Sequence, residues 1–172
     1  AFRFASYCGI SGVTKKEETL ADGAATVAAL SAAVTAMDDE EVTATGRYLF
    51  ITPTLLQGIN DMDTTKSKKV LEGFEQVIKV PQRRFYTAIK QLSGKTGEEA
   101  GGYTKATGAA NINFAIVQKD ALIQYTKHAA PKIIAPENNP DADAYVFGYR
   151  MVGIAKAYKN MLSGMYFSHD KA

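Results

Sequence analysis

The residues that could carry nucleophilic or acid–base chemistry are few and widely spaced. The chain has two histidines, His128 and His169, and one cysteine, Cys8. Cys8 with His128 and an Asp or Asn could form a nucleophilic set, yet a lone cysteine at a helix end is more often a small buried residue. Neither histidine has carboxylates at metal-ligand spacing, a single cysteine excludes an internal disulfide, and no serine lies in a Gly-x-Ser-x-Gly turn.

Two acidic clusters could hold a cation. Asp38–Glu41 is a run of acids at the end of a predicted helix, but consecutive acids do not share a helix face, so a solvated helix end is favoured. Asp141 and Asp143 are a spaced pair, but they lie in a turn, where Asp is common for backbone reasons. Because no cluster has the spacing of a catalytic or ligand set, we predict no catalytic residue, no metal site and no cofactor.

Two basic motifs could bind phosphate or nucleic acid. Gly94-Lys95-Thr96 ends like a phosphate-binding loop, but that motif needs a glycine where this chain has Ile89. Without that glycine the backbone amides cannot surround a phosphate. Arg83-Arg84 beside Phe85-Tyr86 could stack on nucleic acid, although charges in solvent at the exit of a strand are the favoured interpretation.

Composition is that of an ordinary globular protein. Hydrophobic residues make up 46% and charged residues 22% of the 172 residues, so wholesale disorder is excluded. A net charge of +2 is too weak and too scattered to indicate nucleic-acid binding. No apolar run approaches the ~18 residues that span a bilayer, and no signal peptide is visible. We therefore expect a soluble protein that is made inside the cell.

Apolar spacing predicts the elements that position these residues. Asp22 can cap a helix that runs to Glu41, with apolar residues at spacings of three, four and three. Thr52 followed by Pro53 is the pattern of a second helix start. Three short apolar runs, each too short for a buried helix, predict strands of one mixed sheet flanked by these helices: Tyr48–Ile51, Val77–Val80 and Ile112–Val117.

The remaining segments are assigned from weaker signals. Ala1–Cys8 is predicted to be the end of a helix, capped by the glycine that follows. Phe85, Ile89 and Leu92, at spacings of four and three, allow a short helix from about Arg84. Loops are predicted for three polar or glycine-rich stretches, the last of them a mobile excursion: Ile10–Leu20, Asn60–Ser67 and Ser93–Asn111.

The run from Ala144 to Tyr158 is rich in Tyr, Val, Phe and Ile and favours a strand. A helix would hold Gly148 and Gly153 in its interior, each costing about 1 kcal/mol relative to Ala. A strand of this length spans roughly 50 Å, so we expect a bend at Gly153. Such long strands are more typical of assembly proteins than of enzymes. One face of this strand would hold Tyr145, Phe147, Tyr149 and Met151, and the other face would hold Val146, Arg150, Val152 and Ile154. The aromatic residues of the first face are interpreted as core or subunit contacts.

The order of several segments is informative. The apolar run at 112–117 is followed by Lys119-Asp120-Ala121, by a Pro-Glu-Asn-Asn-Pro-Asp-Ala-Asp-Ala-Tyr turn at 136–145, by a Tyr-Arg strand and by Gly164–Phe167. This order resembles the C-terminal part of tailed-phage major capsid proteins. Ala1–Ala5 is similar to the end of the family's spine helix. Arg47–Pro53 and Val80–Phe85 are similar to two strands of its axial domain.

The resemblance implies an α+β chain with the Hong Kong 97-type capsid fold. Residues 1–20 would end the spine helix and connect a peripheral domain to an axial domain over residues 21–125. Residues 126–160 would be peripheral-domain strands, and residues 161–172 a C-terminal strand returning to the axial domain. An N-terminal arm, an extended loop and most of the spine helix would precede Ala1. Without them, we expect the chain to form only monomers or small oligomers.

The function that the resemblance implies is structural rather than enzymatic. Many copies of the major head protein of a tailed bacteriophage or prophage would form hexamers and pentamers of an icosahedral shell around double-stranded DNA. DNA would be contacted only non-specifically, and scaffolding protein, protease and portal would be further partners. The protein would be made in the bacterial cytoplasm and end in the virion, without contact with a membrane.

Two alternatives remain open. One is an encapsulin-like nanocompartment shell, which would have the same fold. The other, from a different class, is a small α+β enzyme or ligand-binding domain, which a deep apolar pocket with convergent titratable groups would favour.

Overall fold

The structure, a computed structural model, describes residues 1–62 and 65–171 and divides into two units. The larger unit contains Ala1–Ala121 and Lys159–Ala172, and the smaller unit is Leu122–Tyr158. Helices account for 32% and strands for 35%, which confirms the α+β class. In the described part of the chain, no helix is long and apolar enough to cross a membrane.

The larger unit is built on a five-stranded mixed sheet in the order β1-β9-β6-β2-β3. β6 is antiparallel to both of its neighbours, whereas the outer pairs β1/β9 and β2/β3 are parallel. All three predicted strands lie in this sheet, as predicted, although β3 is only half-buried at its centre. The strands are β1 (Thr14–Glu17), β2 (Arg47–Ile51), β3 (Gln76–Lys79), β6 (Ile112–Gln118) and β9 (Met165–His169).

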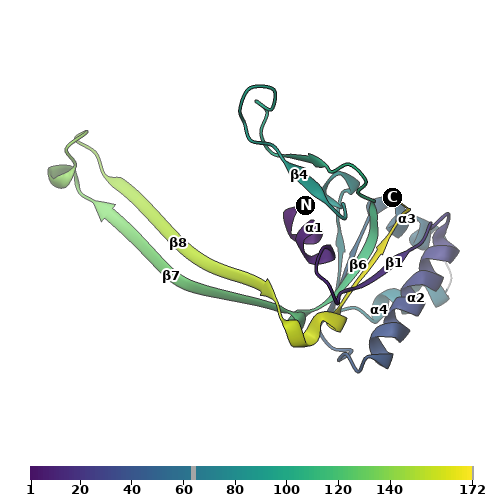
Figure 1. Ribbon diagram of the computed structural model, residues 1–172. Coiled ribbons are helices and arrows are strands. Elements are labelled where there is room, and N and C mark those ends of the chain that lie inside the picture. The colour runs from purple at the N-terminus through teal and green to yellow at the C-terminus, as the bar shows by residue number, and fades with distance from the viewer. Residues whose placement is uncertain (63–64, 172) are drawn as a thin grey trace. The chain divides into compact units, whose positions relative to one another are not determined.

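Three helices pack on one face of the sheet (Figure 1): α2 (Gly23–Asp39), α3 (Pro53–Asp61) and α4 (Thr65–Glu72). α2 begins where it was predicted, because the Asp22 carboxylate accepts a hydrogen bond from the Ala25 amide at 2.7 Å. α3 likewise begins at the predicted Pro53. Helices and sheet share one core, which includes Val27, Leu30, Met37, Leu49, Ile51, Ile59, Phe114, Ile116 and Tyr166.

The opposite face of the sheet is covered by α1 (Phe2–Cys8), which ends before Gly9 as predicted (Figure 1). The Phe4 ring meets Phe50 and Phe85 edge-on, at centroid distances of 5.2 and 4.7 Å. Because both faces of the sheet are covered, every residue of β6 is buried. This burial explains why β6 is a nearly continuous apolar run rather than an alternating one.

Two predicted loops contain regular structure. Within Ile10–Leu20, the exposed residues Thr14–Glu17 form the edge strand β1. Residues 63–64 of the predicted loop Asn60–Ser67 lie outside the described residues, but its described ends belong to α3 and α4. Both predictions are wrong because the mainly polar residues of these two stretches give no apolar periodicity.

The predicted helix from Arg84 is also wrong. The chain forms a short 3-10 turn, η1 (Gln82–Arg84), and then the strand β4 (Ile89–Gln91). β4 pairs with β5 (Tyr103–Lys105), so the predicted loop Ser93–Asn111 contains one strand of a small hairpin. Two further 3-10 turns, η2 (Lys119–Ala121) and η4 (Lys159–Gly164), complete the larger unit.

The smaller unit is a single antiparallel hairpin of β7 (Leu122–Ile134) and β8 (Val146–Ala157), with the turn η3 (Pro136–Asn138) at its tip. The long strand predicted at Ala144–Tyr158 is confirmed. β8 continues without interruption through Gly153, where a bend was predicted. The irregularity lies in the partner strand β7, where the register shifts between Thr126 and His128. Both strands curve smoothly (Figure 1).

Candidate functional site

Exposed apolar side chains along the β7–β8 hairpin are the feature that most needs a functional explanation. None of residues 122–158 is buried, and Phe147 and Tyr149 are 75% and 69% exposed. Contiguous exposed apolar surface of this kind marks interaction sites in soluble proteins. The other large exposed apolar residues of the hairpin are Ile123, Tyr125, Ile133, Tyr145, Val146, Met151, Val152, Ile154 and Tyr158.

The strand register divides the hairpin into two faces, because residues directly opposite one another point to the same side. Within β8, this confirms the predicted division into Phe147, Tyr149 and Met151 on one side and Val146, Arg150, Val152 and Ile154 on the other; Tyr145, predicted on the first side, precedes β8. The first side, which we call the uncharged face, holds Leu122, Gln124, Thr126, Ala129, Pro131, Ile133, Phe147, Tyr149, Met151, Gly153, Ala155 and Ala157. The second, the basic face, holds Ile123, Tyr125, His128, Ala130, Lys132, Ile134, Val146, Gly148, Arg150, Val152, Ile154 and Lys156.

Aromatic side chains on the uncharged face make local contacts, one of them with Tyr145, which precedes β8. The rings of Tyr145 and Phe147 stack at a centroid distance of 6.2 Å. The Tyr149 hydroxyl donates to the Met151 sulfur at 3.8 Å. Pre-ordered aromatic side chains lose little rotamer freedom on binding, which suits a contact surface.

The residues considered for nucleophilic chemistry lie in different units, Cys8 in the larger unit and His128 in the hairpin. Cys8 is only 3% exposed, and burial raises the pKa of its thiol, which disfavours the reactive thiolate. His128 belongs to the hairpin unit, where it pairs across the strands with Val152. The Nδ1 atom of His169 lies 2.8 Å from the Asp170 carbonyl oxygen. Among the described residues, no group of three His, Cys, Asp or Glu side chains could hold a metal ion.

Within the acidic clusters, one carboxylate and one backbone amide have structural partners. Asp38 accepts a hydrogen bond from the Arg47 guanidinium at 2.6 Å. Asp141, in the hairpin tip, donates its backbone amide to the Asn139 side-chain oxygen at 3.2 Å. Asp143 is exposed in the same tip.

The basic motifs are also placed without a binding geometry. Arg83-Arg84 lies exposed in η1, but Phe85 is fully buried and cannot stack on a base. The neighbouring Tyr86 ring is covered by the Lys105 ammonium group at 5.6 Å. Gly94-Lys95-Thr96 lies in the turn between β4 and β5, with open space around its glycine.

Sequence reasoning missed a part-buried polar network that joins β1, β6 and β9. The Ser168 hydroxyl donates to Glu18 at 2.6 Å, and the Asn113 side-chain amide donates to the Glu18 carbonyl at 3.0 Å. Lys16 approaches the second carboxylate oxygen of Glu18 at 3.3 Å. Because Ser168 is fully buried, the network stabilises the sheet and offers no accessible nucleophile. Ser168 and Glu18 are 150 residues apart in the sequence, so no local sequence pattern predicts this network.

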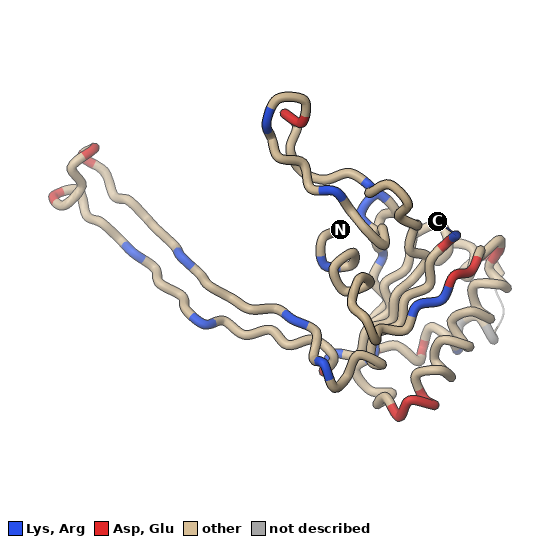
Figure 2. The backbone as a smooth tube through the Cα atoms, viewed as in Figure 1, with Lys and Arg blue, Asp and Glu red and all other residues tan. Residues whose placement is uncertain are grey.

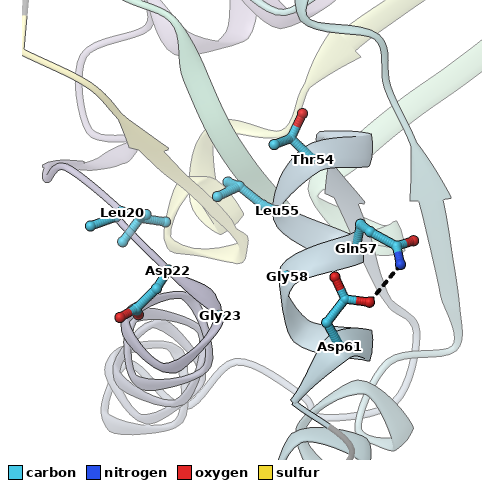
Figure 3. A pocket seen from close by; sticks show the side chains of 9 residues that line it. Leu20, Asp22, Gly23, Thr54, Leu55, Gln57, Gly58 and Asp61 are labelled. Carbon is cyan, nitrogen blue, oxygen red and sulfur yellow. Dashed lines mark hydrogen bonds between the residues drawn. The ribbon is translucent and has the colours of Figure 1, made fainter.

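A shallow pocket of about 420 Å³ lies between the start of α2 and α3 (Figure 3). Leu20, Thr54 and Leu55 contribute to its lining. Its two carboxylates already accept hydrogen bonds, Asp22 from the Ala25 amide and Asp61 from the Gln57 side chain at 2.7 Å. The pocket therefore lacks the convergent free titratable groups that would favour an enzyme or ligand-binding domain.

The hairpin is consequently the candidate functional site, and its chemistry is that of an interaction surface. The chain was compared with protein-family models and with curated proteins, and it matches none of them.

Proposed function

We propose that this chain is a structural subunit of the capsid of a tailed bacteriophage or prophage, with the Hong Kong 97-type fold. In this proposal the β7–β8 hairpin contacts neighbouring copies of the chain in an icosahedral shell. The observation that carries the proposal is the hairpin itself, which exposes apolar side chains on both faces and buries none of its residues.

The energetics of the hairpin favour a contact surface over a free appendage. An isolated two-stranded hairpin is at best marginally stable in water. Burying an aromatic or aliphatic side chain contributes about 1.5–3 kcal/mol. Coverage of Phe147, Tyr149 and Met151 by a neighbouring subunit would therefore stabilise both the hairpin and the assembly.

The larger unit and the sequence support the same proposal. Its mixed sheet, with helices on both faces, fits the axial domain expected from the resemblance. The Pro-Glu-Asn-Asn-Pro turn of the resemblance, at 136–140, forms the tip of the hairpin. The pocket between α2 and α3 has no convergent free titratable groups, so it gives the enzyme alternative no support.

The proposal is tested by asking which particles contain this chain. We expect its peptides to dominate mass spectra of DNA-filled, tailed particles purified from an induced culture of the source cells. Peptides of an abundant ribosomal protein serve as the control for contamination. Recovery of the chain only in low-mass fractions would contradict the proposal, whereas recovery in tailless, DNA-free shells would favour the encapsulin-like alternative.

A further inference from the structure

Charges of opposite sign occupy different parts of the hairpin. The strands β7 and β8 contain basic residues and no acidic ones, namely Lys127, Lys132, Arg150 and Lys156. The connecting segment 135–145, which we call the acidic tip, contains acidic residues and no basic ones, namely Glu137, Asp141 and Asp143. Figure 2 shows the Lys and Arg positions along both strands and the Asp and Glu positions confined to the tip.

The basic residues also have a defined side. By the strand register, Lys132, Arg150 and Lys156 belong to the basic face, and Lys127 is the extra residue at the register shift. All of the hairpin's charged side chains are exposed. Within the described residues, no ion pair joins the acidic tip to the basic residues of the strands.

The acidic tip is held in a defined turn. The Asn139 side-chain amide donates to the Ala144 carbonyl at 2.9 Å, and its oxygen accepts the Asp141 amide. The Asn139 backbone amide donates to the Pro136 carbonyl at 3.1 Å. The carboxylates are therefore presented from an ordered loop, so a partner need not order that loop on binding.

The acidic tip cannot reach the far basic residues of its own hairpin. Lys156 lies ten residues along β8 from Val146, or roughly 33 Å at about 3.3 Å per residue. Lys127 lies seven residues from the tip end of β7, or roughly 23 Å. Both separations exceed the Debye length of about 10 Å at 0.1 M salt. The carboxylates of the same tip therefore cannot pair with Lys127 or Lys156, whereas the acidic tip of another copy can approach them.

We propose that the acidic tip of one copy docks on the basic face of the hairpin of a second copy. The inference rests on the proposed function, because it requires copies of this chain to pack together. Each copy would use its tip toward one neighbour and its basic face toward another, a head-to-tail contact that generates rings when it closes. Ile123, Tyr125 and Ile154 supply apolar area, while the charges set register and orientation.

A competing explanation is that the lysines keep hairpins apart, as charges on exposed strands commonly do. Salt separates the two explanations. Attraction between tip and basic face predicts that association weakens when salt rises from about 50 mM to about 500 mM, whereas repulsion between basic strands predicts that it strengthens.

A charge-swap experiment on the full chain, followed by sedimentation velocity, tests the proposal directly. One variant carries Glu137→Lys, Asp141→Lys and Asp143→Lys; the other carries Lys132→Glu, Arg150→Glu and Lys156→Glu. We expect each variant alone to associate at least about tenfold more weakly than the unmodified chain. An equimolar mixture should recover the association, because a basic tip then meets an acidic face.

The matched control reverses three exposed lysines of the larger unit, Lys15→Glu, Lys79→Glu and Lys95→Glu, which changes the net charge by as much as the face variant does. Circular dichroism confirms that all variants are folded. The proposal is overturned if the mixture fails to associate, if the control weakens association equally, if association strengthens with salt, or if the unmodified chain remains monomeric at low salt. The mass spectrometry of purified particles tests the capsid proposal independently of these results. Failure of the docking proposal can therefore be distinguished from failure of the capsid proposal.

Discussion

Arg47 shows how a single side chain organises the junction between α2 and β2. Its guanidinium is 2% exposed and donates to three acceptors: the Asp38 carboxylate, the Thr43 carbonyl at 3.1 Å and the Val42 carbonyl. A buried charge is tolerated only when it is fully hydrogen-bonded. The sequence predicted a solvated acidic end for α2. In the structure, one of its carboxylates, that of Asp38, is a partner of Arg47.

Arg47→Met should lower the free energy of unfolding by about 2–4 kcal/mol, because the buried Val42 carbonyl oxygen and the part-buried Thr43 carbonyl oxygen both lose this donor. Asp38→Asn is the matched control and should cost less than about 1 kcal/mol, since the Asp38 side chain is 55% exposed. Urea denaturation measures both. Equal losses would mean that the ion pair, and not the carbonyl contacts, carries the stabilisation.

Glu98, in the turn between β4 and β5, provides a pH-dependent contact. Its pKa is lowered to about 2, chiefly by the hydrogen bond from Lys90 at 2.7 Å and next by the Ser93 amide at 2.8 Å. A carboxyl group with a lowered folded-state pKa contributes stability that is fully present above its ordinary pKa of 4.5 and is lost as the pH falls toward 2.

We therefore expect the turn to keep its order above pH 4.5 and to loosen between pH 4.5 and about 2. Titration of the Glu98 side-chain carbon by nuclear magnetic resonance measures this directly. Lys90→Met should raise the pKa of Glu98 toward 4.5, whereas Lys95→Met should leave it unchanged. An unchanged pKa in Lys90→Met would show that the ammonium group is not its main cause.

Among the elements, those with a strong apolar pattern were predictable and those without it were not. α2, β2 and β6 have apolar periodicity or continuous apolar runs, and their positions were predicted within a few residues. β1 has the sequence Thr-Lys-Lys-Glu, has no apolar pattern, and lies at the sheet edge through its pairing with β9. Phe85 and Ile89 are spaced as in a helix, yet Phe85 is buried in the core and Ile89 begins the β4–β5 hairpin. Tertiary packing therefore overrides the helical spacing.

The candidate site was predictable in part. Alternation in the sequence predicted the two faces of β8. The sequence alone did not show that Lys132 lies on the same face as Arg150 and Lys156. That assignment depends on how β7 pairs with β8, and a shift of one residue in this pairing would place Lys132 on the other face. The register shift beside Lys127 has no clear sequence signal.

α2 and α3 approach so closely at Gly23 and Gly58 that these two glycines should respond in opposite directions. A Cβ atom added at Gly23 would lie 2.2 Å from the Gly58 carbonyl oxygen, so the helices would have to separate. A Cβ at Gly58 would lie 3.5 Å from the Gly23 nitrogen, an ordinary contact.

We expect Gly23→Ala to destabilise the protein by about 1–3 kcal/mol, a typical cost of overpacking. Gly58→Ala should be neutral or stabilising by up to about 1 kcal/mol, because alanine favours the interior of a helix. Thermal unfolding measures both variants. A cost at Gly58 that matches the cost at Gly23 would contradict the close approach at Gly23.

At the scale of the whole molecule, the division into two units predicts which part folds independently. Every buried apolar residue of the described chain lies in the larger unit. Leu122 and Ala157 are paired at the open end of the hairpin, so a short glycine-rich linker can replace residues 122–158.

The shortened chain should keep the sheet and helices, with an unfolding free energy within about 0.5 kcal/mol of that of the full chain. It should also lose any self-association that the full chain shows. Near-ultraviolet circular dichroism, urea denaturation and sedimentation provide these three readouts. A shortened chain that is unfolded would show that the hairpin belongs to the same cooperative folding unit.

The position of β9 between β1 and β6 has a consequence for how the protein is made. Thr14 pairs with Tyr166, so strands from distant parts of the sequence become neighbours in the sheet. Such non-local pairing forms slowly during folding, because the entropy cost of closing a long loop comes before any stabilising contact forms. During synthesis, one edge of β6 stays unpaired until residues 165–169 leave the ribosome. The chain therefore completes its sheet only after residues 165–169 have been translated, so a shorter, unfinished chain has an incomplete sheet.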